Sequence, residues 1–245
     1  MIPDWLHLLA IVMILSGVTS FTLLLVTVIY RPQHMAIMNV VWPVTGLYAG
    51  PLALWGYYRY GSLARDDIAR AAMERGEPMP HKERTPFWAS VGKGATHCGA
   101  GCTIADIIAE TVAYLFPVVA VLFGYKILFA EKIFAVWIFD YVLALLIGIA
   151  FQYASLKPMN PEMTRVEALK SAIKADVLSL TAWQIGMYGS IAVAHFIVFA
   201  SLLGVSIDPS MPEFWASMQI AMICGFATAF PVNRWLIRKG LKERM

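Results

Sequence analysis

The chain has 245 residues, of which 59% are hydrophobic and only 14% are charged, and its formal net charge is +3. Soluble globular domains contain roughly 45–50% apolar and about 25% charged residues. This composition therefore excludes an ordinary soluble domain and predicts a polytopic membrane protein. The three cysteines are too few, and too odd in number, for a disulfide scaffold.

Hydrophobic segments predict the architecture. Each is long enough for the roughly 20 residues that cross a hydrocarbon core, and none shows the two-residue alternation of barrel strands. The segment that contains Pro43 and Pro51 is broken internally, which membrane helices tolerate where the freed backbone groups line a cavity or find other partners. We expect an all-α integral membrane bundle of about six transmembrane helices, which forms a single transmembrane domain over residues 1–245. The expected spans are 4–30, 35–61, 95–128, 133–156, 175–205 and 213–237.

Lysine and arginine residues are concentrated in three segments. Sixteen of the 19 are shared among residues 59–93, 157–174 and 234–244. The remaining three, Arg31, Lys126 and Lys132, are expected on the other side of the membrane. The positive-inside rule then predicts that both termini are cytoplasmic, in agreement with an even number of spans. Residues 59–94 are expected to form a cytoplasmic loop with a short amphipathic helix, which is too small to be a soluble catalytic domain.

The segment "ATHCGAGCTIADIIAE", residues 95–110, carries thiol and acidic side chains into the third expected span. Cys98, Cys102, Asp106 and Glu110 recur every fourth residue, so a helix places them on one face. A carboxylate that faced lipid would cost about 2.5–3.5 kcal/mol or more. This face is therefore expected to look into the protein or into water, with the thiols at the cytoplasmic mouth and the acids deeper.

His97, Cys98 and Cys102 form a candidate metal site. Thiolate, thioether and imidazole ligands suit soft or borderline metals, so copper or zinc would be the bound ion. Cβ atoms one helical turn apart are separated by about 5–6 Å, beyond the roughly 3.5–4.5 Å of a disulfide, but both thiols can reach one ion. Packing is the alternative, because free cysteines are commonly inert core residues.

A polar path is expected to continue from the thiols. Ionisable residues inside a membrane are rare and mark functional sites by default. The alternative is an interhelical hydrogen-bond network that only satisfies its own members. The candidate side chains are Asp106, Glu110, Asp140, Asp176, Gln184 and His195.

Four sequence blocks resemble a bacterial family, domain of unknown function 4396. They are "WPVTGLYAGPLALWGYYRYG", "HCGAGCTIADIIAE", "KADVLSLTAWQIGMYG" and "FPVNRWLIRKGLKERM". The resemblance covers most of the chain and implies a polytopic inner-membrane protein. It implies no activity, substrate or catalytic residue.

The leading hypothesis is a bacterial inner-membrane protein that binds or translocates a soft metal ion, with copper preferred. No ATPase module is evident, so a proton or ion gradient would supply the energy unless transport is passive. One alternative is a membrane-embedded metalloenzyme or thiol/quinone oxidoreductase; another is a non-catalytic structural or assembly subunit. The expected partners are the lipid bilayer, a metal ion, and a second copy or another membrane subunit. Nucleic acid is not an expected partner.

Overall fold

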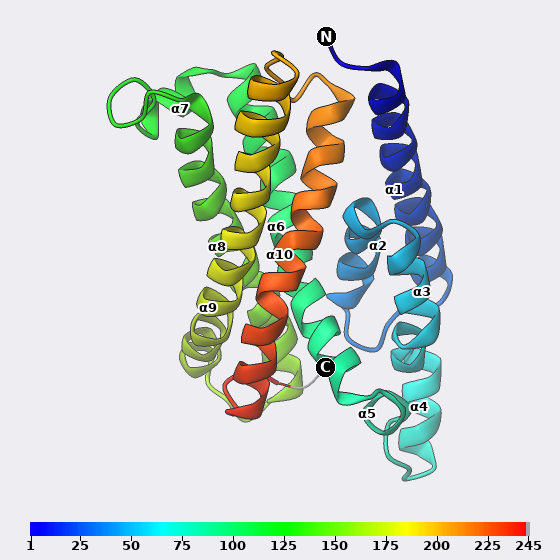
Figure 1. Cartoon of the computed structure of the whole chain (residues 1–245). Helices are drawn as coiled ribbons and strands as arrows, with labels where there is room; N and C mark the ends of the chain where they lie inside the picture. Colours follow the sequence, from blue (N-terminus) through cyan, green and yellow to red (C-terminus); the bar gives the residue numbers. More distant parts are fainter. Residues whose placement is uncertain (244–245) are drawn as a thin grey trace.

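The computed structural model describes residues 1–243, which are almost entirely helical and contain no β-strand. Five helical segments in this range are long and apolar enough to cross a membrane, and they pack side by side as a bundle (Figure 1). An all-α bundle of apolar helices is therefore confirmed, with five candidate spans where about six were expected. They are α1 (Asp4–Tyr30), α6 (Phe87–Leu115), α8 (Lys132–Met159), α9 (Arg165–Ala192) with its π-helical continuation (Val193–Leu202), and α10 (Pro212–Arg238).

The second expected span is a pair of short helices instead of one spanning helix. α2 (Met38–Ala49) has 12 residues and α3 (Pro51–Arg59) has nine, so they are only about 18 Å and 14 Å long at 1.5 Å per residue. The chain reverses between them at Gly50, whose φ of 53° favours glycine. Pro51 then occupies the first turn of α3, where its missing N–H costs no helical hydrogen bond.

This helical hairpin, residues 38–59, enters and leaves at the same end of the bundle. The residues on either side of the hairpin are in contact: the backbone N–H of His34, which precedes it, donates to the carbonyl of Ala64, which follows it, at 2.9 Å. Its tip reaches the middle of the bundle, where Gln219 of α10 donates to the Leu47 carbonyl at 2.6 Å and to the Met13 carbonyl of α1 at 3.3 Å. The hairpin is therefore inserted to about half the depth of the bundle.

Because the hairpin does not cross the bundle, the two ends of the described chain lie at opposite ends (Figure 1). The Met1 ammonium group donates to the Leu203 carbonyl at 3.2 Å, beyond the π-helical segment, whereas Lys242 contacts Gly94 near the start of α6. The prediction that both termini are cytoplasmic came from the positive-inside rule and agreed with an even number of spans, whereas termini at opposite ends of the bundle do not fit an even number. Arg244 of the basic tail lies outside the described residues.

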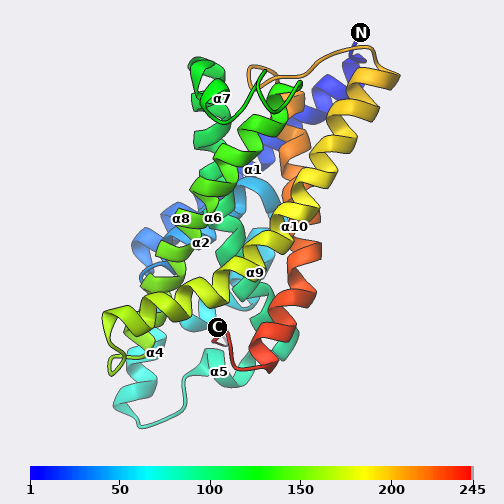
Figure 2. The ribbon, with the colours of Figure 1, turned by 90° about the vertical axis from the view of Figure 1, so that its left-hand side faces the viewer.

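The basic residues still gather at one end, which we call the basic end. It contains the base of the hairpin, the 3₁₀ turn Gly61–Ala64, α4 (Asp66–Glu74), α5 (Pro80–Arg84) and the connection between α8 and α9 (Figure 2). Arg31 follows α1 at this end, in contrast to its expected place on the other side. Among the described lysines and arginines, only Lys126 and Lys132 belong to the opposite end, where α7 (Val118–Leu122) lies.

In a membrane, the positive-inside rule places the basic end in the cytoplasm, so this topology predicts an external N-terminus and a cytoplasmic C-terminus. We expect protease to remove an N-terminal epitope tag from right-side-out membrane vesicles and a C-terminal tag only from inverted ones. The same tags in detergent-opened vesicles control for cleavage. Protection of both tags in right-side-out vesicles would restore the six-span topology.

The helix that carries the acidic stripe begins earlier than expected. α6 starts at Phe87 rather than residue 95 and ends at Leu115, before the break at Pro117. The thiols of Cys98 and Cys102 therefore lie inside the helix and not at its mouth. The Thr96 hydroxyl donates to the Lys93 carbonyl at 2.9 Å within this helix.

Candidate functional site

The four predicted carboxyl side chains point into the bundle. Asp106, Asp140 and Asp176 are at most 2% exposed and Glu110 is 9% exposed. An isolated carboxylate is costly to bury, so buried ones require hydrogen-bond donors, cations or a bound proton. The contacts of these four residues therefore define what the site can do.

Asp106 of α6 and Asp140 of α8 form a carboxyl pair within hydrogen-bonding reach of each other. The Oδ2 atom of Asp140 accepts from the Tyr188 hydroxyl at 2.6 Å and from Gln184 Nε2 at 3.2 Å, both on α9. Asp106 Oδ2 and Asp140 Oδ1 have no partner among the described residues. Two carboxyl groups this close favour a state in which they share one proton, so the pair can take up and release protons.

A cavity of about 150 Å³ adjoins Asp106 at the hairpin tip. It opens at the side of the bundle, since its lining includes the exposed side chains of Val18 and Ile107. Tyr48, on the hairpin, also lines this cavity, and its buried hydroxyl lies toward Gly99, where a β-carbon would be 2.8 Å from it. Asp106 is the only ionisable carboxyl group in its lining, which also includes Leu47, Thr103, Trp215, Met218, Gln219 and Met222.

Glu110 and Gln184 belong to the surroundings of this pair, but His195 does not. Glu110 lies within electrostatic reach of Asp140 and of Lys132, whose Nζ donates to the Ala113 carbonyl at 2.9 Å. His195 lies in the π-helical segment and is only partly buried. Its place in the predicted polar path is therefore not supported by these contacts.

Asp176 lies nearer the basic end, apart from the carboxyl pair. It is a neighbour of Cys98 and of the buried Lys242. Burial lowers the pKa of the Lys242 ammonium group below its usual range. The residues of the predicted path thus form two groups: the Asp106–Asp140 pair, and a second group around Asp176 that lies nearer the basic end.

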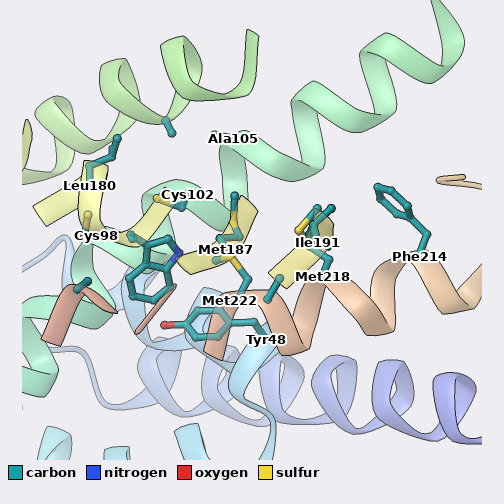
Figure 3. Close-up of a cluster of buried hydrophobic side chains, with 14 of the residues drawn as sticks. Tyr48, Cys98, Cys102, Ala105, Leu180, Met187, Ile191, Phe214, Met218 and Met222 are labelled. Atoms are coloured by element: carbon teal, nitrogen blue, oxygen red, sulfur yellow. The ribbon is translucent and has the colours of Figure 1, made fainter. Parts of the chain in front are cut away.

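The three predicted metal ligands are not assembled into one site. Successive helical residues diverge by about 100°, and His97 accordingly faces α8, where its Nε2 atom is 2.7 Å from the Ser155 hydroxyl. No group of three His, Cys, Asp or Glu side chains within residues 1–243 is arranged to hold a metal ion. Cys98 and Cys102 instead belong to a buried cluster with thioethers and apolar side chains, among them Leu180, Trp183, Met187, Met218 and Met222 (Figure 3).

Sequence reasoning missed Lys242, Asn233 and Tyr48 as members of the polar interior. Lys242 and Asn233 lie near the C-terminus among basic residues that suggest a solvated tail, and the sequence carries no sign that the tail folds back. Tyr48 was placed in a spanning helix, so its position at a hairpin tip was not foreseen. Tyr188, which donates to Asp140, lies one helical turn after the predicted Gln184.

Comparisons with known proteins give one match. The family model described as Domain of unknown function (DUF4396) matches residues 87–242. This range begins with α6 and ends at Lys242, so it contains both polar groups but neither α1 nor the hairpin. The "WPVTGL" block, which suggested the same family, lies outside it. No curated protein and no solved structure matches the chain.

Proposed function

The chain belongs to this family of unknown function, and we propose that it is a bacterial inner-membrane transport protein that couples the movement of a small cation to protons. The observation that carries this proposal is the Asp106–Asp140 pair, buried in the bundle and open to a cavity on the Asp106 side. Cation binding at Asp106 would expel the shared proton, and proton return would expel the cation. The Asp106–Asp140 pair would thereby couple the movement of the cation to the movement of the proton.

The half-depth hairpin supports the same proposal. Non-helical backbone at membrane depth is tolerated where it is buried in protein or lines a water-filled cavity. Transporters also place their binding sites near the midplane at interrupted helices. Here the hairpin tip, with Leu47 and Tyr48, forms one wall of the cavity next to Asp106. A movement of this tip would change access to the carboxyl pair.

A soft metal ion is the second candidate for the cargo, with Cu(I) as the preferred ion. The thioethers of Met218 and Met222 line the same cavity as Asp106, and the thiols of Cys98 and Cys102 belong to the adjoining cluster. Sulfur ligands select soft ions such as Cu(I), whereas oxygen ligands favour hard cations. In this form of the proposal, the methionines replace His97 in the predicted metal site.

Proton flux in proteoliposomes tests both forms. Gradients of K⁺, Na⁺ or Cu(I) would be imposed, and a trapped pH-sensitive dye would report proton movement. We expect cation-dependent flux in the wild type and at least a tenfold reduction in Asp106→Asn, which keeps the hydrogen-bonding shape but not the acidic group.

Glu213→Gln is the matched control, because Glu213 is also buried but pairs with His7 at 2.6 Å, away from the cavity. Flux with Cu(I) alone would identify a soft-metal carrier, and flux with K⁺ or Na⁺ a hard-cation carrier. The enzymatic and structural alternatives predict no cation-dependent flux. Its absence in the wild type, or its persistence in Asp106→Asn, would overturn the proposal.

A further inference from the structure

The side chain of Lys242 is buried at the basic end although it follows the last helix. It is 4% exposed, and lysine is almost never fully buried unless paired. The chain turns back after α10 at Gly240, whose φ is 68°. The Lys242 ammonium group then donates to the Gly94 carbonyl at 3.1 Å and to Asn233 Oδ1 at 2.7 Å.

The surroundings of this ammonium group are rich in oxygen acceptors and negative charge. Asp176 lies within electrostatic reach of Lys242 and is 1% exposed. Its Oδ2 atom has no partner among the described residues. A backbone carbonyl and an amide oxygen therefore contact the ammonium group directly, and a buried carboxyl group lies nearby without forming an ion pair with it.

Other contacts hold these acceptors in position. The Asn233 amide group donates to the Ser179 hydroxyl at 2.7 Å and to the Ala229 carbonyl at 2.9 Å, which directs its oxygen toward Lys242. A β-carbon at Gly148 would lie 2.3 Å from Asp176 Oδ2, so only glycine leaves room for this carboxyl group. The acceptors are thus part of the helix packing and do not depend on the tail.

We propose that Gly94, Asn233 and Asp176 form a binding site for a compact monovalent cation, and that Lys242 occupies it in this structure as a tethered stand-in. Neutral oxygens with one carboxylate match the ligands that K⁺ or ammonium would take, since carbonyl oxygens replace the hydration shell of K⁺ in proteins. The inference rests on the proposed transport function and gives the cation an entry site at the basic end. Release of the short tail would open that site.

Cation-dependent thermal unfolding tests this proposal in the full-length protein. Lys242→Met removes the ammonium group but keeps an apolar stem. We expect KCl or NH₄Cl, compared with choline chloride, to raise the unfolding temperature of this variant in a saturable manner, and to have little effect on the wild type. The double variant Lys242→Met/Asp176→Asn should lose the response. Lys239→Met, at an exposed position of the same tail, should behave as the wild type.

A second measurement needs no variant. If K⁺ competes with Lys242, trypsin should cleave the wild-type tail after Lys242 several-fold faster in KCl than in choline chloride of equal ionic strength. Unchanged cleavage, together with no K⁺ response in folded Lys242→Met, would overturn the proposal. If both cation measurements were negative but proton flux still depended on Asp106, the entry site would be wrong and the proposed transport function would stand. Cation stabilisation without flux would instead retain the site and remove the transport function.

Discussion

Asp140→Leu should lower the free energy of unfolding by about 2–6 kcal/mol, the cost of two buried polar groups left without a partner at about 1–3 kcal/mol each. Asp140→Asn should lower it far less. The difference follows from the contacts of Asp140, which accepts hydrogen bonds from Tyr188 and Gln184. Leucine leaves Gln184 Nε2 and Asp106 unpartnered in the bundle interior, whereas the Tyr188 hydroxyl keeps the Trp137 carbonyl as an acceptor at 2.9 Å. Each unsatisfied buried group costs about 1–3 kcal/mol. Asparagine still offers an acceptor oxygen.

Unfolding of the purified variants in detergent, followed by helical circular dichroism, measures both effects. Val142→Leu, at a 42% exposed position of the same helix, controls for a leucine on α8. In the flux assay, Asp140→Asn should be as inactive as Asp106→Asn although it is folded. Equal stability of Asp140→Leu and the wild type would show that the pair is not held by these contacts. Proton flux in Asp140→Asn would show that Asp140 does not take part in transport.

The acidic stripe could be predicted because helical spacing and the cost of burying charge act locally. Four-residue spacing places Asp106 and Glu110 on one face whatever the neighbours are, and that face has to avoid lipid. The opposite directions of the two neighbouring helices predict that Asp140 lies near the depth of Glu110, and its pairing with Asp106, one turn away, depends on how α6 and α8 pack. Which hydroxyl or amide group would satisfy Asp140 depends on the rotation of α9, and the sequence does not fix that rotation.

The hairpin could not be distinguished from a span by length and hydropathy. Residues 35–61 are apolar and long enough to cross a membrane, and membrane helices accommodate proline. Pro43 indeed lies inside α2 without ending it. The reversal depends on Gly50 and on the packing of the tip against α1 and α10, which are tertiary contacts. Because these residues form a hairpin and not a span, the structure has one candidate span fewer than expected, the N-terminus lies at the end opposite to the C-terminus, and the hairpin tip forms a wall of the cavity.

Gly46→Ala should disrupt the docking of the hairpin, because α1 and α2 cross with their backbones in contact. A β-carbon at Gly46 would lie 2.7 Å from the Phe21 nitrogen and 2.9 Å from the Ser20 carbonyl carbon. Both are backbone atoms and cannot turn aside as a side chain would. Overpacking in a core typically costs about 1–3 kcal/mol and sometimes more, and we expect this variant to lie at or above the upper limit.

The same substitution at Gly189 of α9 is the control, since a β-carbon there meets nothing within 4 Å. Gly189→Ala should be neutral, or stabilising by up to about 1 kcal/mol, because alanine is the better helix former. The unfolding free energy in detergent should therefore fall in Gly46→Ala and stay equal or rise in Gly189→Ala. A displaced hairpin also removes Leu47 and Tyr48 from the cavity wall, so proton flux in Gly46→Ala should no longer require the cation. Coupled flux at wild-type stability in Gly46→Ala would show that the hairpin docks without this close contact and that its tip does not control access to Asp106.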